Sequence, residues 1–157
     1  MDNAYKALGD AEYVLELLEE CEDDKRYFRI LFVACMTLLK TIGQVLVSKN
    51  ADPIVKKTAL ELYSEHKANE DDHKIFFRFI ERERGLIIHE YDVNLPEYDF
   101  PLVLIQGDKA TQFYIGDLYH PLAEDDYFGN EDVRDLIQKA IDWWKNQLEI
   151  IKKRLPA

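Results

Sequence analysis

Hydrophobic residues recur every three or four positions through most of the chain, the spacing that places them on one side of an α-helix. This pattern predicts a first helix over about residues 5–21 and a second, apolar on most sides, over 26–48. A third helix is expected after Asp52 and Pro53, a capping residue and a proline suited to the first helical position, and it ends near residue 66. The first part of the chain is therefore expected to be helical.

Two further helices are predicted in the second half of the chain. One covers Phe76 to Tyr91. The other is expected to begin after a cap at Asn130, with Glu131 and Asp132 in its first turn, where acidic side chains favour the helix dipole. Its apolar stripe comprises Val133, Ile137, Ala140, Trp144, Leu148, Ile151 and Leu155.

The helical period stops between these two helices, over residues 92–129, where proline and glycine interrupt the chain. Leu102–Gln106 and Thr111–Ile115 flank Gly107 and Asp108, a pattern typical of a β-hairpin. An isolated two-stranded ribbon is only marginally stable in water, so nearby aromatic side chains are expected to anchor it to the helices. These aromatic residues are Tyr98, Phe100, Phe113, Tyr114 and Tyr119.

The elements together predict a single, mostly α domain over residues 1–157. Its fold class is a helical bundle of about five helices, with a small insertion that contains the β-hairpin before the last helix.

The fourth predicted helix combines a core face with charged side chains. At about 100° per residue, its apolar side chains gather on one broad arc, with Glu83 and Glu90 near the middle and Arg84 towards the edge. Because a buried ion needs a partner, Glu83 and Glu90 are predicted to form structural ion pairs, and Arg84 to pair with a carboxylate of a neighbouring helix. The apolar residues of the arc are Ile75, Phe76, Phe79, Ile80, Leu86 and Ile87.

A second stripe of the same helix joins Arg78, Arg82, Gly85 and His89. Gly85 has no side chain, so another helix or a ligand could approach closely, although glycine costs a helix about 1 kcal/mol relative to alanine. This cost favours an interface or a ligand site, and the helix is predicted to form a homodimer.

Composition limits the partners and the location of the protein. With 31 acidic and 20 basic residues the formal net charge is −11, which repels nucleic-acid backbones. DNA is therefore not an expected partner, and any contact with RNA must be local and cationic. Cys21 and Cys35 have apolar neighbours and are expected to be reduced core residues. The N-terminus lacks a secretory pattern and the apolar run over 30–39 is too short to span a bilayer, so a cytoplasmic location without a membrane partner is expected.

A single E-x-x-H string joins Glu70 to His73. Helical di-iron proteins use two such motifs and two further carboxylates, so acidic capping of the following helix is the better interpretation. The sequence predicts no metal site and no cofactor.

The string from Arg84 to Tyr91 reads R-x4-H-x-Y, with His89 as its histidine. This motif resembles that of the HEPN superfamily. The resemblance implies a helical bundle whose two protomers pair, so that both motifs line one cleft that cuts RNA without metal. In some toxin members a partner nucleotidyltransferase adds adenylate groups to the tyrosine, and Tyr91 matches that position. Catalytic members usually carry a polar residue after the arginine, where this chain has Gly85.

Two interpretations of the motif remain. In the structural one, Arg84 pairs with a core carboxylate and His89 ends a helix, where an imidazolium suits the dipole. In the catalytic one, Arg84 steadies phosphate oxygens and His89 moves protons. Since five residues correspond to about 140° around a helix, Arg78 and Arg82, on the stripe of His89, are alternative phosphate or RNA contacts.

Three functions therefore stay open. The first is a metal-independent endoribonuclease of the toxin type. The second is a non-catalytic dimeric module that binds a protein or a nucleotide. The third is a toxin–antitoxin partner that is modified at Tyr91 by a nucleotidyltransferase-type protein.

Overall fold

The predicted helices form a bundle in the computed structural model, which describes residues 1–21, 24–96, 101–114 and 119–156, with only the backbone at 101, 102, 113 and 114. The described residues are mostly helical and include a hairpin before the last helix, so the predicted fold class is confirmed. The elements are α1 (Asp2–Glu19), α2 (Lys25–Leu46), α3 (Pro53–Lys67), the short 3-10 helix η1 (Glu70–His73), the π-helix η2 (Ile75–Ile80), α4 (Glu81–Glu90), β1 (Pro101–Gln106), β2 (Lys109–Tyr114) and α5 (Val133–Arg154).

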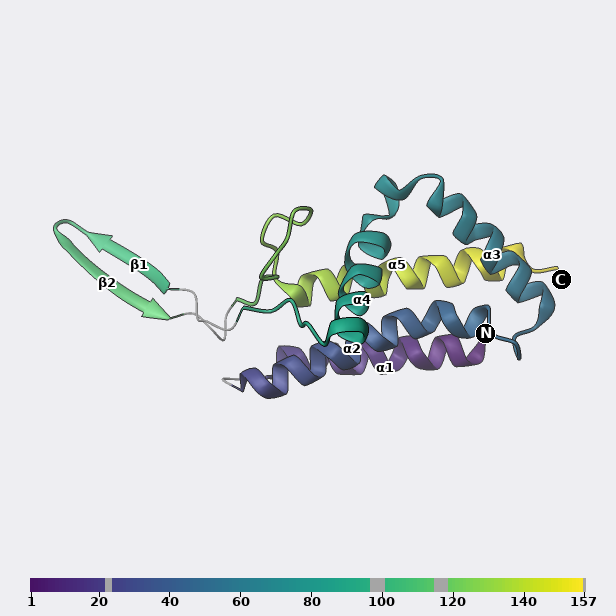
Figure 1. Cartoon of the computed structure of the whole chain (residues 1–157), viewed down its shortest axis with the longest axis horizontal. Coiled ribbons are helices and arrows are strands. Elements are labelled where there is room, and N and C mark those ends of the chain that lie inside the picture. The colour runs from purple at the N-terminus through teal and green to yellow at the C-terminus, as the bar shows by residue number, and fades with distance from the viewer. Residues whose placement is uncertain (22–23, 97–100, 115–118, 157) are drawn as a thin grey trace.

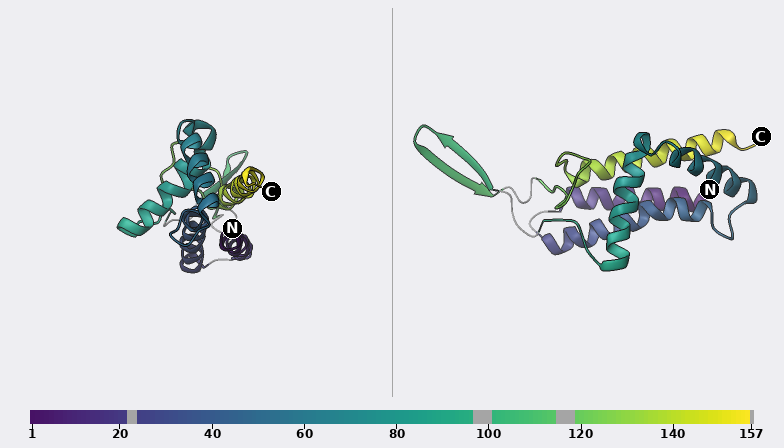
Figure 2. Two further views of the ribbon diagram at one scale, coloured as in Figure 1. Left: turned by 90° about the vertical axis from the view of Figure 1, so that its right-hand side faces the viewer. Right: turned by 45° about the horizontal axis from the view of Figure 1, so that its top comes forward.

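The three longest helices, α1, α2 and α5, lie along the long axis of the molecule (Figure 1), and α1 packs against both of the others. Helix α3 lies at an angle beside α2 and α5 (Figure 1). Helix α4 crosses the long helices, and its C-terminal end extends beyond them (Figure 2). This crossing leaves the last turn of α4 outside the bundle.

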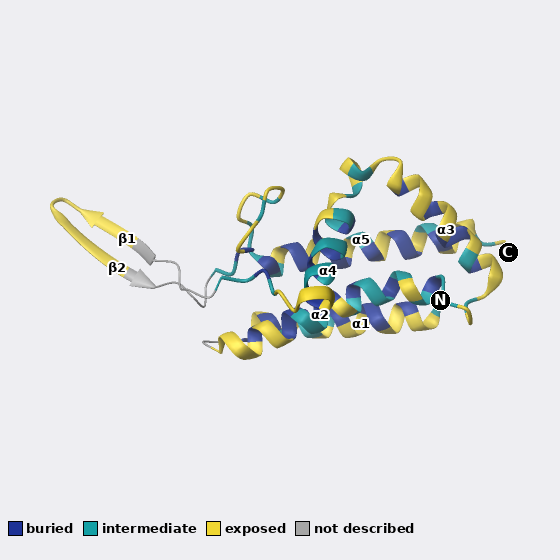
Figure 3. Ribbon diagram, in the orientation of Figure 1, coloured by how far each residue is buried: buried dark blue, intermediate teal, exposed yellow. Residues whose placement is uncertain are grey.

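The core lies where the apolar stripes of the helices meet, and these stripes are turned inward (Figure 3). Helix α2 contributes eight buried residues along its length, as expected for a central helix. By length and composition alone α2 could also cross a membrane, a test that core helices pass as well. Cys21 and Cys35 are free and buried, as predicted, and burial raises the pKa of the Cys35 thiol to about 12.

The caps of two helices test the predicted boundaries. Asp52 caps α3 as predicted, since its carboxylate accepts hydrogen bonds from the backbone N–H groups of Ile54 and Val55 at 2.9 and 3.2 Å. The predicted cap of the last helix at Asn130 is wrong. Asn130 has a left-handed backbone (φ 62°) and lies two residues before the cap, which is Asp132, whose carboxylate accepts from the Arg134 backbone N–H.

Asp132 also ties the insertion to the bundle. One carboxylate oxygen accepts from the Arg134 backbone N–H at 2.9 Å, and the other accepts from the His120 backbone N–H at 2.9 Å. The His120 ring stacks on Phe28 of α2, with ring centroids 3.9 Å apart. The exit of the insertion is thereby held against α2 and the start of α5.

The hairpin forms around Gly107, whose positive φ of 63° suits a tight turn between β1 and β2. This prediction is confirmed for the described residues, and Ile115 lies outside them. The hairpin stands apart from the bundle (Figure 1), and its described part contacts no helix. Val103, Leu104 and Ile105 are exposed.

The expected anchoring of the hairpin by aromatic residues is not seen in the part of the chain that the structure describes. Tyr98 and Phe100, and the side chains of Phe113 and Tyr114, lie outside that part. The Tyr119 hydroxyl donates to the backbone carbonyl of Asn130, which directly follows the insertion and precedes α5.

An aromatic cluster centred on Phe76 joins η2 to α3 and α5. The Phe76 ring stacks on Trp143, with centroids 4.9 Å apart, and meets Trp144 and Tyr63 edge-on at 5.7 and 6.2 Å. Gly43 of α2 makes room for this cluster, because a Cβ atom there would lie 2.9 Å from Cη2 of Trp144. This packing holds the start of the η2–α4 segment against α3 and α5.

Gly43→Ala should therefore destabilise the protein by roughly 1–3 kcal/mol, because it overpacks a dense core. Gly9→Ala is the matched control, since a Cβ atom at that exposed position in α1 meets nothing within 4 Å and should stabilise by up to about 1 kcal/mol. Urea unfolding of both variants measures the difference. Equal stability of the two variants would show that the contact between Gly43 and Trp144 is not tight.

Candidate functional site on helix α4

The segment that carries the motif begins as a π-helix. The backbone N–H of Glu81 donates to the Phe76 carbonyl, five residues back, before α4 continues with ordinary helical geometry. π-Turns are rare and occur frequently at functional sites. The predicted core arc is buried at Phe76, Phe79, Ile80 and Ile87, whereas Ile75 and Leu86 are half-buried.

Glu83 is fully buried, and it accepts two hydrogen bonds on one carboxylate oxygen. Arg82 Nη1 and Asn94 Nδ2 each lie 3.1 Å from Glu83 Oε1, while Oε2 has no partner among the described residues. The ion pair of Glu83 thus involves Arg82. Burial raises the pKa of Glu83 to about 7, against the lowering effect of Asn94 and Arg82.

Asn94 and Glu124 connect α4 to the two ends of the insertion. Asn94 Nδ2 donates to the Glu124 carbonyl at 2.9 Å, and the Glu124 N–H donates to Asn94 Oδ1 at 2.7 Å. Arg82 Nη1 donates to the same carbonyl at 3.0 Å. Asn94 is not among the residues predicted from the sequence, because a single asparagine in an irregular segment carries no periodic signal.

Arg78 and Arg82, the alternative phosphate contacts, both bind groups within the protein. Arg78 Nη2 lies 3.6 Å from Glu70 Oε2, and its guanidinium lies over the Tyr127 ring, 5.0 Å from the centroid. The side chains of Arg78 and Arg82 remain 44% and 32% exposed. Both can therefore still present part of a guanidinium to a ligand.

Arg84 is half-buried and His89 is exposed. In the described part of the chain, Arg84 forms no ion pair or hydrogen bond, so the carboxylate partner expected from a neighbouring helix is not seen. No contact joins Arg84 to His89, which lie about 140° apart around the helix axis. One protomer does not bring these two side chains together.

Helix α4 ends where the motif ends. Tyr91 adopts a left-handed conformation (φ 50°), its N–H donates to the Ile87 carbonyl at 3.0 Å, and its side chain is 66% exposed. Glu90 is exposed, and the prediction that it forms an ion pair in the core is wrong. Glu90 is on the predicted apolar side of the helix but does not reach the core, because the last turn of α4 extends beyond the long helices.

The protruding end of α4 carries an open surface, which we call the α4 face: Arg84, Gly85, Ile88, His89 and Tyr91. Two large apolar side chains of this face, Ile88 and Tyr91, are 52% and 66% exposed. A Cβ atom at Gly85 would meet nothing within 4 Å. The exposed end of α4 is visible in Figure 3.

The E-x-x-H string forms other contacts. Glu70 faces Arg78, and His73 Nδ1 accepts a hydrogen bond from Trp143 Nε1 at 3.1 Å. Within the described residues, no group of three or more His, Cys, Asp or Glu side chains could hold a metal ion.

Comparison with known proteins adds no relative. No protein-family model, no curated protein and no solved structure matches the chain.

The buried Glu83 predicts a pH-dependent stability. Its pKa rises from an ordinary value of 4.5 to about 7 in the fold, so the folded state keeps this proton to higher pH than the unfolded chain does. The free energy of unfolding of the wild type, relative to Glu83→Gln, should therefore decrease as pH rises from about 4.5 to 7 and then level off. Denaturant unfolding of both proteins at several pH values across this range measures the difference in free energy of unfolding.

Glu90→Gln is the control, because the Glu90 carboxylate is exposed on the same helix. The free energy of unfolding of this variant should change with pH as that of the wild type does. A constant difference between the wild type and Glu83→Gln would contradict the raised pKa of the buried Glu83 carboxyl.

Proposed function

We propose that the chain is a HEPN-like protein that forms a homodimer through the α4 face and acts as a metal-independent endoribonuclease of the toxin type. The observation that supports this proposal is the α4 face itself, where the motif residues Arg84, His89 and Tyr91 accompany exposed Ile88 and open Gly85. Exposed apolar side chains next to a glycine, which has no side chain of its own, suit close contact with a second helix.

A dimer would supply what one protomer lacks. Arg84 and His89 diverge on one helix, whereas a two-fold axis beside α4 would double both groups within one cleft. One imidazole could then activate the 2′-hydroxyl of RNA while the other protonates the leaving 5′-oxygen. The Arg84 guanidinium would hold the non-bridging phosphate oxygens by paired hydrogen bonds.

Local charge is compatible with this role despite the net charge of −11. Arg78, Arg82 and Arg84 lie on one continuous helical segment, and each keeps part of its side chain accessible. Such a cluster can contact a short stretch of RNA, while the acidic remainder of the surface repels longer duplexes.

The alternative function is a non-catalytic dimeric module that binds a protein or a nucleotide. Arg82 donates hydrogen bonds to Glu83 and to the Glu124 carbonyl. Arg78 lies beside Glu70 and over the Tyr127 ring. These contacts within the protein favour a structural role for both arginines. Tyr91 is accessible enough to be the target of a nucleotidyltransferase-type partner, the third function. The α4 face would form an interface in all three cases.

The dimer is tested by its mass in solution. Light scattering should report about twice 18.5 kDa for the wild type, and Ile88→Glu should yield the monomer, because it places a charge in the apolar contact. Ile54→Glu on α3 is the matched control, since Ile54 is 50% exposed and lies outside the α4 face. A wild-type protein that stays monomeric at tens of micromolar would count against the dimer and its composite site.

Ribonuclease activity is tested on a structured RNA. His89→Ala should reduce cleavage by about 10²–10⁴-fold because proton transfer is lost, and Arg84→Ala by about 10²–10³-fold because charge stabilisation is lost. Cleavage should continue in the presence of a chelator and leave 2′,3′-cyclic phosphate ends.

Arg29→Ala is the control, because Arg29 is an exposed arginine on α2 and should leave the rate unchanged. Activity that survives His89→Ala, or that disappears with the chelator, would exclude the proposed ribonuclease. A dimer without any cleavage would favour the non-catalytic module.

A further inference from the structure

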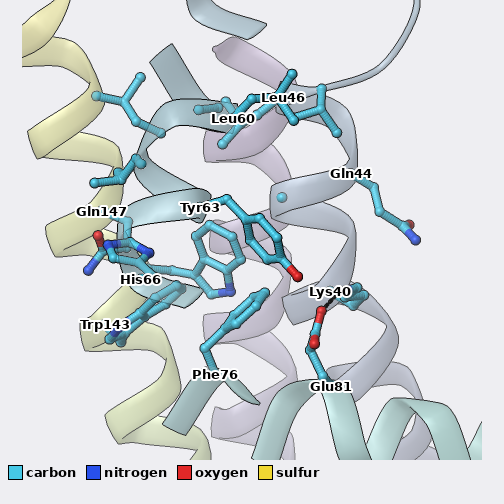
Figure 4. Close-up of a pocket in the computed structure, with 16 residues that line it drawn as sticks. Lys40, Gln44, Leu46, Leu60, Tyr63, His66, Phe76, Glu81, Trp143 and Gln147 are labelled. Atoms are coloured by element: carbon cyan, nitrogen blue, oxygen red, sulfur yellow. Dashed lines mark hydrogen bonds and ion pairs between the residues drawn. The ribbon is translucent and has the colours of Figure 1, made fainter. Parts of the chain in front are cut away.

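The β1–β2 hairpin exposes apolar side chains that no other described part of the chain covers. Val103, Leu104 and Ile105 are 52%, 54% and 73% exposed. The bundle has an open pocket of about 230 Å³ with apolar and aromatic walls, between α2, α3, the start of the η2–α4 segment and α5 (Figure 4). The described hairpin contacts none of these helices. Since a two-stranded hairpin alone is only marginally stable in water, pairing with a further strand would stabilise it.

The outer edge of β1 presents backbone groups that can pair with another strand. Gln106 faces Lys109 across the two-residue turn, so these two form a hydrogen-bonded pair, and such pairs alternate along the hairpin. Val103 and Ile105 therefore stand in non-hydrogen-bonded pairs, and their N–H and C=O groups point away from β2. Among the described residues, no third strand and no backbone hydrogen bond from outside the hairpin reaches this edge.

Charge favours a second copy of this chain as the partner. The segment 101–114 contains one acidic and one basic residue, Asp108 and Lys109, so the hairpin is neutral in a chain of formal net charge −11. Two copies repel each other through their acidic bundles, and the hairpins, which extend away from the bundles (Figure 1), let them meet where this repulsion is weakest. Strand β1 has no charged residue, whereas β2 begins with Lys109, a residue type that protects strand edges from pairing.

We propose that β1 pairs with β1 of a second copy, antiparallel across a two-fold axis at Leu104, which joins the two hairpins into one sheet. Val103 of each copy then faces Ile105 of the other, and each facing pair exchanges both of its hydrogen bonds. A register centred on Val103 would instead place Ile105 opposite Pro101, which has no N–H to donate. One face of the sheet carries Val103 and Ile105 of both copies, and the other face carries both Leu104 side chains.

The pocket of a second copy is a less favourable partner for the hairpin. The helices that line this pocket use their backbone groups internally, so a hairpin inserted there would leave the edge of β1 unpaired. The shared edge is about 20 Å long, and contacts of this size are weak, so roughly millimolar protein is needed to populate the pairing. At tens of micromolar it does not change the mass of the protein. The proposal depends neither on the α4 face nor on ribonuclease activity.

Disulfide trapping in the full-length protein tests the register. Leu104→Cys should cross-link two copies under mild oxidation, because facing residues of a non-hydrogen-bonded pair have Cα atoms about 4.5 Å apart. Val103→Cys alone should cross-link far less, since the two Val103 positions are diagonal neighbours about 7–8 Å apart. A mixture of Val103→Cys and Ile105→Cys should form the mixed dimer. Adding Ile88→Glu to Leu104→Cys should leave the cross-link intact, because the pairing does not involve the α4 face.

Asp108→Cys is the control for random collision, because Asp108 is exposed at the turn of the same hairpin. If Asp108→Cys cross-links as fast as Leu104→Cys, the pairing is not specific and the proposal fails. Equal cross-linking of Val103→Cys and Leu104→Cys would indicate parallel strands and exclude the antiparallel register. No cross-link at Leu104 would also overturn the proposal, and is expected if the hairpin enters the pocket of a second copy or binds a different protein.

Light scattering tests the pairing without a cross-link. The average mass of the wild type should rise by about half between about 0.05 and 1 mM protein, as mass action requires for a dissociation constant of about 1 mM. Leu104→Lys should abolish this rise, because it places two like charges directly opposite each other. Thr111→Lys is the matched control, since Thr111 is exposed, faces Leu104 within the hairpin and lies away from the β1 edge. A constant mass of the wild type, or an equal effect of the two lysines, would contradict the pairing.

Discussion

The packing of Phe76 against Trp143, Trp144 and Tyr63 is the interaction on which the arrangement of the molecule depends. It fixes the π-helix η2 to α5 and α3, and α4 follows η2 without interruption. Because α4 starts from this point, it crosses the long helices and its last turn projects beyond them (Figure 2). The same aromatic rings line the pocket, while Gly43 leaves the space that Trp144 occupies. One cluster thus holds the start of the η2–α4 segment and lines the pocket.

The helices and the hairpin could be predicted because each has a strong local signal. The apolar period marked α2 and α5, Asp52 and Pro53 marked the start of α3, and Gly107 marked the turn between β1 and β2. The cap of α5 was wrongly predicted at Asn130, because asparagine suits both a helix cap and a left-handed turn. The sequence shows residue types, whereas the choice between these two conformations depends on the contacts that Asp132 makes with His120 and Arg134.

The candidate site was only partly predictable for a related reason. The helical period correctly placed Glu83 in the core, but it placed Glu90 there as well, because periodicity does not reveal where a helix leaves the bundle. The partner of Glu83 is Arg82, whose guanidinium also donates to the Glu124 carbonyl in a distant segment. Partners of this kind lie far apart in the chain and cannot be deduced from local spacing.

The central claim is that two copies of the protein meet at the α4 face, with Gly85 at the closest approach. Gly85→Cys tests it directly, because a disulfide forms only when the two Cα atoms come within about 7 Å. Cys21 and Cys35 are buried and should not compete. Under mild oxidation the variant should migrate at about twice 18.5 kDa on a non-reducing gel, while Gly9→Cys, on exposed α1, should not. A Gly85→Cys protein that remains monomeric, like this control, would contradict the account.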